Sequence, residues 1–426
     1  MEAVAGIDRA TQPLKLEGCS LVDDTPFERR HLVARAGTRV PSSTMALSTP
    51  PTAHAGSAAA RVLALWELWF IIAAHSGVVG AWRLAGVCRA ARQGAKEWLQ
   101  KLPGFVVCGG WIGGRHTSEV WRLDLGALRW ERLPDLTAGR SYHACCAVRG
   151  GVVALGGFVA ARKPTAGVEI LGRDSSEVVG NIFNVLPPLS CGPIETSAAI
   201  LIDESESHRG QVLLICGRDE EGPSSAVRKV DLGTGVCTAQ PSLLCPQGHH
   251  VFDCTSTTGR LPDGRIVCAG TTCMEYSDGE SSEEEGLEFY TMAQVLEPPL
   301  HGSPSGASWQ WRALPGTSDL HSDGSGCVLS DGRFAVFGGH DADSAATSSC
   351  EALTLDADGA RWSPLPPMHE PRCGFACAAI GGCVIVAGGE GSTTDEVYEE
   401  GLGLWRRLPC SVPHDSGLSW MGSALM

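Results

Sequence analysis

The feature that most constrains this chain is an apolar run ending in glycine or another small residue, which recurs six times. In chain order the copies are VVCGG from residue 106, VVALGG from 152, VLLICG from 212, IVCAG from 266, FAVFGG from 334 and VIVAGG from 384. Self-similarity at spacings of about 45–70 residues is typical of repeat architectures such as propellers. The chain is therefore expected to fold as copies of one small unit.

Each unit is expected to contain four strands. Five of the six runs directly follow a turn sequence, namely RGG, RGQ, PDGR, SDGR or IGG, and a further short strand precedes each turn. Asp-Gly and Gly-Gly supply the positive φ that a two-residue hairpin needs. A third strand follows the glycines, and a fourth carries Trp ahead of Leu-Pro in the clearest units, at 118–136, 350–368 and 395–410.

Six four-stranded units with Gly-Gly and Trp landmarks resemble the kelch repeat. The resemblance covers residues 104–426 and implies an all-β fold, a six-bladed β-propeller over 103–426. Glycine accounts for 53 of the 426 residues, which exceeds its usual share of about 7%. This excess agrees with a fold that has many tight turns. The first unit lacks an opening strand, whereas the tail SGLSWMGSALM has no hairpin partner. We therefore expect 418–425 to pair with 105–108 and close the ring.

Residues 61–102 are the one segment with convincing helical periodicity, and Ser76-Gly77 is expected to divide it into two helices. Within it, 62–79 is apolar but carries Glu67 and His75, and a membrane span needs about 20 nearly uncharged residues. A buried amphipathic helix pair is the better interpretation. Residues 1–60 have no periodicity, and we expect a disordered extension without a signal peptide rather than a transit peptide.

The helical segment resembles an F-box. In WRLAGVCRAARQGAKEWL the pattern Leu-x-x-Val-Cys-Arg is followed by Trp98-Leu99, and LALWELWFIIAAHSG upstream resembles the Leu-rich first half. The usual opening Leu-Pro is absent, and Ser76-Gly77 stands where a Leu-Pro turn is common. A helical cap packed under the propeller is the alternative. The resemblance implies adaptor-facing residues, namely Leu65, Leu68, Ile71, Ile72, Leu84, Val87 and Cys88.

Together the two resemblances imply a substrate receptor of a cullin–RING (SCF-type) ubiquitin ligase. The helices would bind a Skp-type adaptor, and the propeller would bind a target protein that the sequence does not identify. Such a chain needs no catalytic residue, cofactor or metal and works as a monomer within a complex. A stand-alone kelch scaffold or cytoskeletal binder is the alternative.

A kelch-type oxidase resembling galactose oxidase is the least favoured interpretation. It would need a Tyr pair, a Tyr–Cys crosslink and two His around copper, and the four tyrosines here are scattered at Tyr142, Tyr276, Tyr290 and Tyr398. The glycines of FVVCGGWIGG are not a dinucleotide fingerprint either, because Cys108 stands at the first position of GxGxxG and a strand follows.

Kelch propellers resembling this one bind partners on the face formed by loops that enter the first strand and leave the second strand of each blade. The candidate residues entering first strands are Arg140, His143, Glu195, His249, His250, His321, Asp323, Arg372 and His414. Those leaving second strands are Trp111, Arg115, His116, His340, Asp341 and Asp343. Arg140 and Arg372 occupy equivalent positions and are the preferred candidates. Solvated loop residues or structural bridges are the alternative, and the acidic segment 277–288 is expected to be a solvated insertion on this face.

The net charge narrows the class of partner, and the cysteine content indicates the cellular location. A net charge of −15 and a pI near 5.3 argue against nucleic acid or an anionic membrane as partner. Eighteen cysteines occur without a CxxC pair, and most stand in apolar runs. We expect reduced, buried thiols in a cytoplasmic protein, with the nucleus as the alternative location.

Overall fold

The computed structural model describes the chain from residue 63 onward, apart from 150, 160–162, 173–181, 204–209, 220–221, 246–249, 252–256, 278–284, 299–308, 358 and 415. The expected disordered extension, 1–60, and most of the acidic segment therefore lie outside the described residues. Everything described belongs to one unit, Ala55–Met426.

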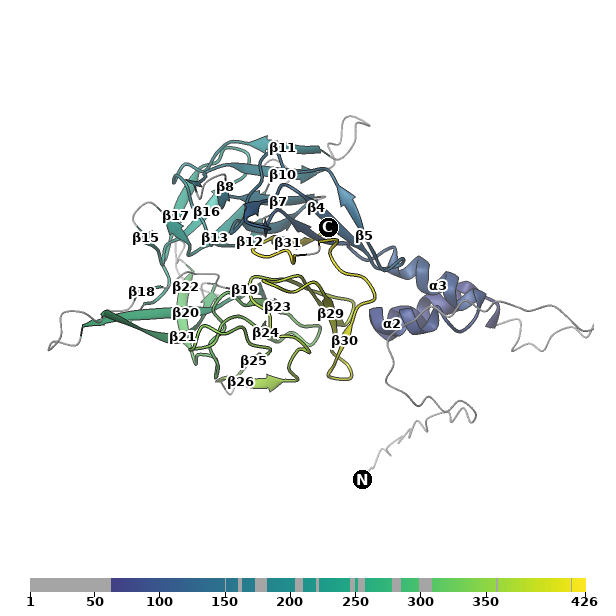
Figure 1. Ribbon diagram of the computed structural model, residues 1–426. Coiled ribbons are helices and arrows are strands. Elements are labelled where there is room, and N and C mark those ends of the chain that lie inside the picture. The colour runs from purple at the N-terminus through teal and green to yellow at the C-terminus, as the bar shows by residue number, and fades with distance from the viewer. Residues whose placement is uncertain are drawn as a thin grey trace, which may run out of the picture. The chain divides into compact units, whose positions relative to one another are not determined.

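Six antiparallel sheets form the blades of a propeller (Figure 1), so the predicted fold class is confirmed. Blade 1 consists, from the inner strand outward, of β31 (Gly422–Leu425), β1 (Phe105–Cys108), β4 (Val120–Asp124) and β5 (Arg129–Leu133). Blade 2 consists of β6 (Ala144–Val148), β7 (Gly151–Leu155), β10 (Val168–Gly172) and β11 (Ile182–Leu186). Blade 3 consists of β12 (Ala198–Asp203), β13 (Gln211–Ile215), β16 (Val227–Asp231) and β17 (Cys237–Gln240).

The second half repeats the plan with one elaboration. Blade 4 consists of β19 (Thr257–Arg260), β20 (Ile266–Ser277), β21 (Glu285–Glu297) and β22 (Gln310–Leu314), with β18 (His250–Val251) paired to the far part of β20. Blade 5 consists of β23 (Ser325–Val328), β24 (Phe334–Phe337), β25 (Cys350–Asp356) and β26 (Gly359–Leu365). Blade 6 consists of β27 (Ala376–Ile380), β28 (Cys383–Ala387), β29 (Asp395–Glu399) and β30 (Leu404–Arg407). Figure 1 shows β20 and β21 continuing outward beyond the other strands.

Short hairpins follow the second strands of three blades. They are β2 (Trp111–Ile112) with β3 (Arg115–His116), β8 (Phe158–Val159) with β9 (Lys163–Pro164), and β14 (Arg218–Asp219) with β15 (Gly222–Pro223). These hairpins occupy the loops that the sequence assigns to the interaction face.

The ring closes as predicted, because the C-terminal strand completes blade 1. β31 pairs antiparallel with β1, with Phe105 opposite Leu425 and Cys108 opposite Gly422. Reciprocal backbone bonds between Gly104 and Met426, of 2.7 and 2.9 Å, extend the ladder. The strand itself begins at Gly422, and Leu418 packs into the core between blades 6 and 1.

The core lies between neighbouring blades, in six clusters, one at each junction. In β1, Phe105 and Val107 face blade 6, whereas Val106 and Cys108 face blade 2, and all four are fully buried. Both faces of a second strand are therefore covered, which explains why these strands are continuous apolar runs without polar alternation. Each fully buried valine contributes about 1.5–3 kcal/mol.

Two helices, α2 (Trp66–Leu84) and α3 (Arg89–Leu99), precede the propeller and pack against it. The predicted break in α2 is confirmed, because Gly77 leaves the helical region at φ 70° and ψ −178°. At this kink the Val78 N–H donates to Gly381 O at 2.9 Å, and a Cβ on Gly77 would lie 2.8 Å from the same oxygen. Glycine is therefore required where the helix touches the β27–β28 turn. Within the described residues, no helix is sufficiently long and apolar to cross a membrane.

Candidate protein-interaction face

The two arginines preferred as partner-binding residues are buried inside the blades, which corrects the prediction. Arg372 is 0% exposed and Arg140 3% exposed. The Arg140 guanidinium pairs with Glu169 and donates to the carbonyls of Gly156 and Gly167, each at 3.0 Å. A desolvated guanidinium is stable only when it is paired and hydrogen-bonded, so these groups are not available to a partner.

The same arrangement recurs in blade 6, and a histidine replaces the arginine in blade 5. Arg372 donates to Gly388 O at 2.8 Å, to Thr394 O at 2.6 Å and to Glu396 Oε1 at 3.0 Å. His321 contacts Gly338 O through Nδ1 at 2.6 Å and Glu351 through Nε2 at 3.4 Å. All three sites share one arrangement, in which the arginine or histidine side chain joins the end of the second strand to a glutamate on the third strand.

Each of these glutamates also fixes the segment that enters its blade. The Thr137 N–H donates to the Glu169 carboxylate at 2.7 Å, and the Asp319 N–H donates to the Glu351 carboxylate at 3.0 Å. In the same way the His369 N–H donates to the Glu396 carboxylate at 2.9 Å. Burial alone would raise the pKa of Glu351, but the bonds from His321 and the Asp319 and Ser318 N–H groups outweigh it and lower that pKa to about 2. The alternative role weighed above, structural bridging, is the one these side chains perform.

The other predicted face residues divide between interior and surface. His143 and Glu195 are buried, the first beside Cys108 Sγ at 3.6 Å and the second against the Arg218 backbone. His414 lies half-buried at 2.9 Å from Glu119 Oε2, which places it beside β4. Arg115 is exposed on β3, and Trp111 is half-buried on β2. The side chain of His250, and all of His249, lie outside the described residues.

A feature that sequence reasoning missed surrounds the mouth of the propeller axis. In five blades the residue two positions before the inner strand has positive φ: Trp420 (57°), Tyr142 (56°), Thr196 (52°), Asp323 (57°) and Gly374 (59°). The equivalent position in blade 4 lies outside the described residues. We call these five residues the mouth ring. Left-handed backbone in non-glycine residues is costly and often marks a functional surface.

Backbone hydrogen bonds run around the mouth ring from blade to blade. Gly374 N–H donates to Asp323 O at 2.9 Å, and Trp420 N–H donates to Gly374 O at 2.7 Å. The series of bonds continues with the Tyr142 N–H, which donates to Trp420 O at 3.0 Å, and the Thr196 N–H, which donates to Tyr142 O at 2.8 Å. The left-handed turn directs each N–H and C=O along the circumference, so the unusual φ values are explained by this ring of bonds.

The mouth carries an aromatic side and an acidic side. On the aromatic side, Tyr142 stacks on Trp420 with ring centroids 4.5 Å apart and planes at 14°, and Phe158 meets Tyr142 edge-on at 5.8 Å. Trp111 lies next to them, because its backbone bonds reciprocally to Ser419. Large aromatics that are partly exposed in rigid positions are the residue types that dominate protein interfaces.

On the acidic side, at the junction of blades 5 and 6, His340 and Glu390 lie next to Asp323 and Cys373. The Asp323 carboxylate is 3.3 Å from His340 Nδ1, and this contact raises the pKa of His340. Burial raises the pKa of the Cys373 thiol to about 12, with the nearby carboxylates of Glu390 and Asp323 adding to the effect. This side of the mouth therefore presents negative charge and imidazole.

Below the mouth, the axis is a channel of about 620 Å³ lined by all six inner strands. Its wall is formed mainly by small residues such as Ala198, Gly326 and Ser423, with Tyr142 and Trp420 at the mouth. Among the described histidine, cysteine and carboxylate side chains, the cluster close enough to hold a metal is His340, Cys373 and Glu390, which has one histidine.

The helical segment places its predicted adaptor-facing residues at different depths. Leu65, Ile71, Val87 and Cys88 are exposed, whereas Leu68, Ile72 and Leu84 are half-buried. Cys88 also caps α3, since its Sγ accepts the Ala91 N–H at 3.3 Å. The opposite face of the segment is buried through Ala73, Val78, Ala81 and Leu99.

Comparison with known proteins finds three similarities. A model of the Kelch motif matches residues 105–137. An F-box/kelch-repeat protein of Arabidopsis thaliana is 30% identical over 134 residues, which is 26% of this chain and 35% of that relative, so the match spans about a third of its length. The solved structure of YjhT aligns at 12% identity with a TM-score of 0.46, covering 62% of this chain and 82% of that one.

Proposed function

Because this chain is a kelch-repeat β-propeller protein and hence a protein-interaction module, we propose that it is a substrate receptor of an SCF-type ubiquitin ligase. The helices α2 and α3 bind a Skp-type adaptor, the propeller mouth binds the target, and the chemistry belongs to partner proteins. Cytoplasmic residence is part of the proposal. The resemblance of the helical segment to an F-box supports it, as does a relative that bears the name F-box/kelch-repeat protein.

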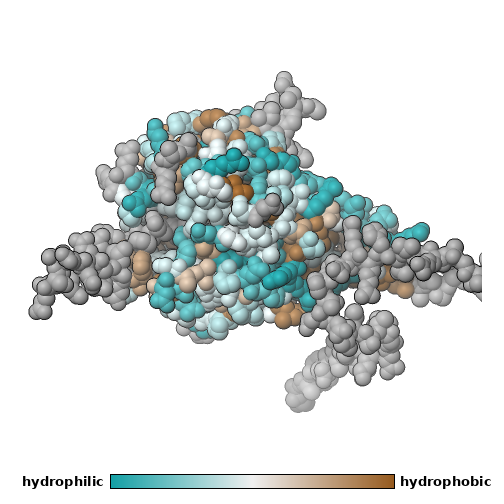
Figure 2. Space-filling view, viewed as in Figure 1, coloured by the Kyte–Doolittle hydropathy of each residue, from teal (hydrophilic) through white to brown (hydrophobic). Residues whose placement is uncertain are grey.

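The observation that carries the proposal is the exposed apolar surface of the helical segment. Among the described residues, ten large hydrophobic side chains are exposed, and four of them lie within residues 63–87: Leu63, Leu65, Ile71 and Val87, at 51–63%. Figure 2 shows hydrophobic surface where the helices meet the propeller. Several exposed large apolar side chains on one short helical segment are more typical of a protein-binding segment than of solvated helices.

Anchoring of the helices makes that surface rigid. Trp82 Nε1 donates to Leu125 O at 2.7 Å, and Arg83 forms two bonds to the Glu399 carboxylate, at 2.8 and 2.6 Å. Gly94 allows α3 to approach α2 closely, since a Cβ there would lie 2.4 Å from Trp66 O. A rigidly docked pair loses little conformational entropy on binding, which favours affinity.

The proposal is tested by titrating a purified Skp-type adaptor into the full chain. Leu65→Asp and Val87→Asp should each weaken binding by about tenfold or more, because central interface contacts contribute more than about 1.4 kcal/mol. Leu402→Asp is the matched control: Leu402 is 58% exposed on the propeller and should leave adaptor affinity unchanged.

Two outcomes contradict the ligase role. One is the absence of measurable adaptor binding by the folded wild-type chain, which would favour the stand-alone kelch scaffold. The other is an equal effect of all three aspartate variants, which would mean that the helical surface is not the binding site.

A further inference from the structure

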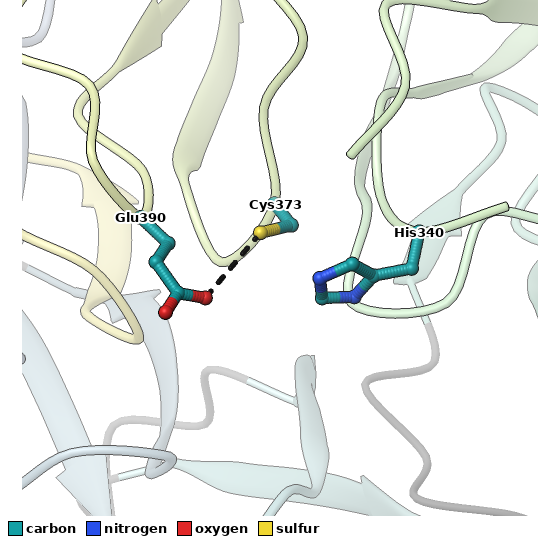
Figure 3. A group of neighbouring side chains, drawn as sticks. All are labelled: His340, Cys373 and Glu390. Atoms are coloured by element: carbon teal, nitrogen blue, oxygen red, sulfur yellow. Dashed lines mark hydrogen bonds between the residues drawn. The ribbon is translucent and has the colours of Figure 1, made fainter. Parts of the chain in front are cut away.

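A cluster of metal-ligating side chains lies at the mouth, where blades 5 and 6 meet. His340 follows β24, Cys373 precedes β27, and Glu390 follows β28. One ligand atom from each of the three lies within 4.8 Å of the others, and Figure 3 shows the thiol between the carboxylate and the imidazole. The three groups come from three loops, so the fold and not the local sequence brings them together.

The spacing of these atoms suits a tetrahedral ion. Cys373 Sγ lies 3.7 Å from Glu390 Oε2. In a tetrahedral site with Zn–S near 2.3 Å and Zn–O near 2.1 Å, two ligand atoms lie about 3.5 Å apart. The thiol position is fixed, because Cys373 is buried and its carbonyl accepts the Glu390 N–H at 3.0 Å. Glu390 is exposed, so its carboxylate has room to close the remaining gap.

A fourth residue, Asp323, orients the imidazole. Its carboxylate lies 3.3 Å from His340 Nδ1, which leaves Nε2 for the cluster. Metal-bound histidines almost always donate the second ring nitrogen to a carboxylate or carbonyl in this way. Asp323 is itself held by the mouth ring, where its carbonyl accepts the Gly374 N–H. The supporting carboxylate is an observation independent of the three ligands.

We propose that His340, Cys373 and Glu390 bind one zinc-class divalent ion, with the fourth position open to water or to a side chain of a bound protein. A thiolate and an imidazole select a borderline-soft ion such as Zn²⁺ over Mg²⁺ or Ca²⁺, which prefer oxygen ligands. Three protein ligands with one open position distinguish this site from closed structural zinc sites.

Charge balance is consistent with a dication. One thiolate and one carboxylate offset its two positive charges, and the thiol proton is released to the solvent when the ion binds. The half-buried His340 and the exposed Glu390 leave a path from the surface. The ion would link blade 5 to blade 6 on the face proposed for the target, and the site does not depend on adaptor binding.

The proposal is tested with Co²⁺ and Zn²⁺ on the full chain after chelation and removal of the chelator. We expect one Co²⁺ per chain with a thiolate-to-cobalt absorption band, and displacement by Zn²⁺. Cys373→Ser should abolish the band, and Asp323→Asn should weaken Zn²⁺ binding by about 10–100-fold, the usual effect of removing such a supporting group. Cys410→Ser, at a half-buried thiol outside the cluster, is the control and should keep the band.

Loss of folding is excluded as an explanation by two measurements. Glu390→Gln alters an exposed side chain and should weaken Zn²⁺ binding while its melting temperature in chelator stays that of the wild type. Wild-type protein should melt higher with Zn²⁺ than with chelator. Absence of stoichiometric binding, or a cobalt band that survives Cys373→Ser, would overturn the proposal.

Discussion

Removal of the C-terminal strand is the most demanding test of how this propeller is held together. The perturbation is deletion of residues 418–426, the segment that contains β31. It removes the inner strand of blade 1 and leaves β1 with an unpaired edge. It leaves every other blade with its complete set of strands.

The expected loss can be worked from the contacts of this segment. Besides the β31–β1 ladder, seven backbone hydrogen bonds join residues 418–426 to the rest of the chain. At about 0.5–1.5 kcal/mol each, together with about 1.5–3 kcal/mol for burying Leu418, they amount to about 5–13 kcal/mol. A domain of this kind has a free energy of unfolding of about 5–15 kcal/mol. The truncated propeller should therefore be unfolded or close to its unfolding midpoint at room temperature.

The assay is urea and thermal unfolding followed by tryptophan fluorescence and circular dichroism. A point variant provides a milder version: Leu418→Ala should cost about 2–5 kcal/mol because Leu418 is 1% exposed. Leu402→Ala, at 58% exposed, is the matched control and should stay within about 0.5 kcal/mol. A synthetic peptide of residues 416–426 should partly restore the truncated protein in a concentration-dependent way.

An unchanged unfolding midpoint after the deletion would refute this reasoning. Equal effects of the two leucine variants would also refute it, because burial between blades 6 and 1 would then not be what stabilises the closure.

Three other perturbations follow from the same contacts. Arg372→Met should cost about 3–5 kcal/mol in urea unfolding, because it leaves a buried carboxylate without its cation, whereas Arg361→Met, at an exposed ion pair, should change little. The folded-state pKa of Glu351 is depressed to about 2, so its contribution is complete above about pH 4.5 and lost towards pH 2; Glu351→Gln should flatten that part of the pH–stability profile. Gly77→Ala should lower the melting temperature, since the added Cβ meets a carbonyl and φ is positive, while Gly401→Ala, with open space around it, should not.

The blade plan and the closure were predictable from sequence because each rests on a pattern with a direct physical cause. A strand covered on both faces must be a continuous apolar run, and Asp-Gly or Gly-Gly must follow where a tight hairpin turns. The missing first strand of blade 1 and the unpaired tail together predicted the pairing of 105–108 with the C-terminus. The kink at Gly77 was also predictable, because it depends on the local residue pair Ser76-Gly77.

The interaction face was less predictable, because its chemistry depends on pairs made across the fold. The position of Arg140 in a loop predicts an exposed side chain. In the structure Arg140 is buried in the blade, because it forms an ion pair with Glu169 on an otherwise apolar strand. A charged residue inside a core strand, as in VEIL and DEVYEE, is the signal that would have indicated the buried pair. The mouth ring had almost no signal, since Tyr142, Thr196 and Trp420 are not residues that usually adopt positive φ.

The closure of blade 1 has a consequence for biosynthesis. Phe105 and Leu425 are paired but stand 320 residues apart in the chain. At about 5–20 residues per second, a ribosome needs roughly 16–64 s to deliver the second after the first. During that interval β1 lacks its inner neighbour, and the apolar helix face that packs on blade 6 has nothing to cover it. Until residues 422–425 have been made, the nascent chain therefore exposes an unpaired strand edge and apolar surface, the two features that make folding intermediates prone to aggregate.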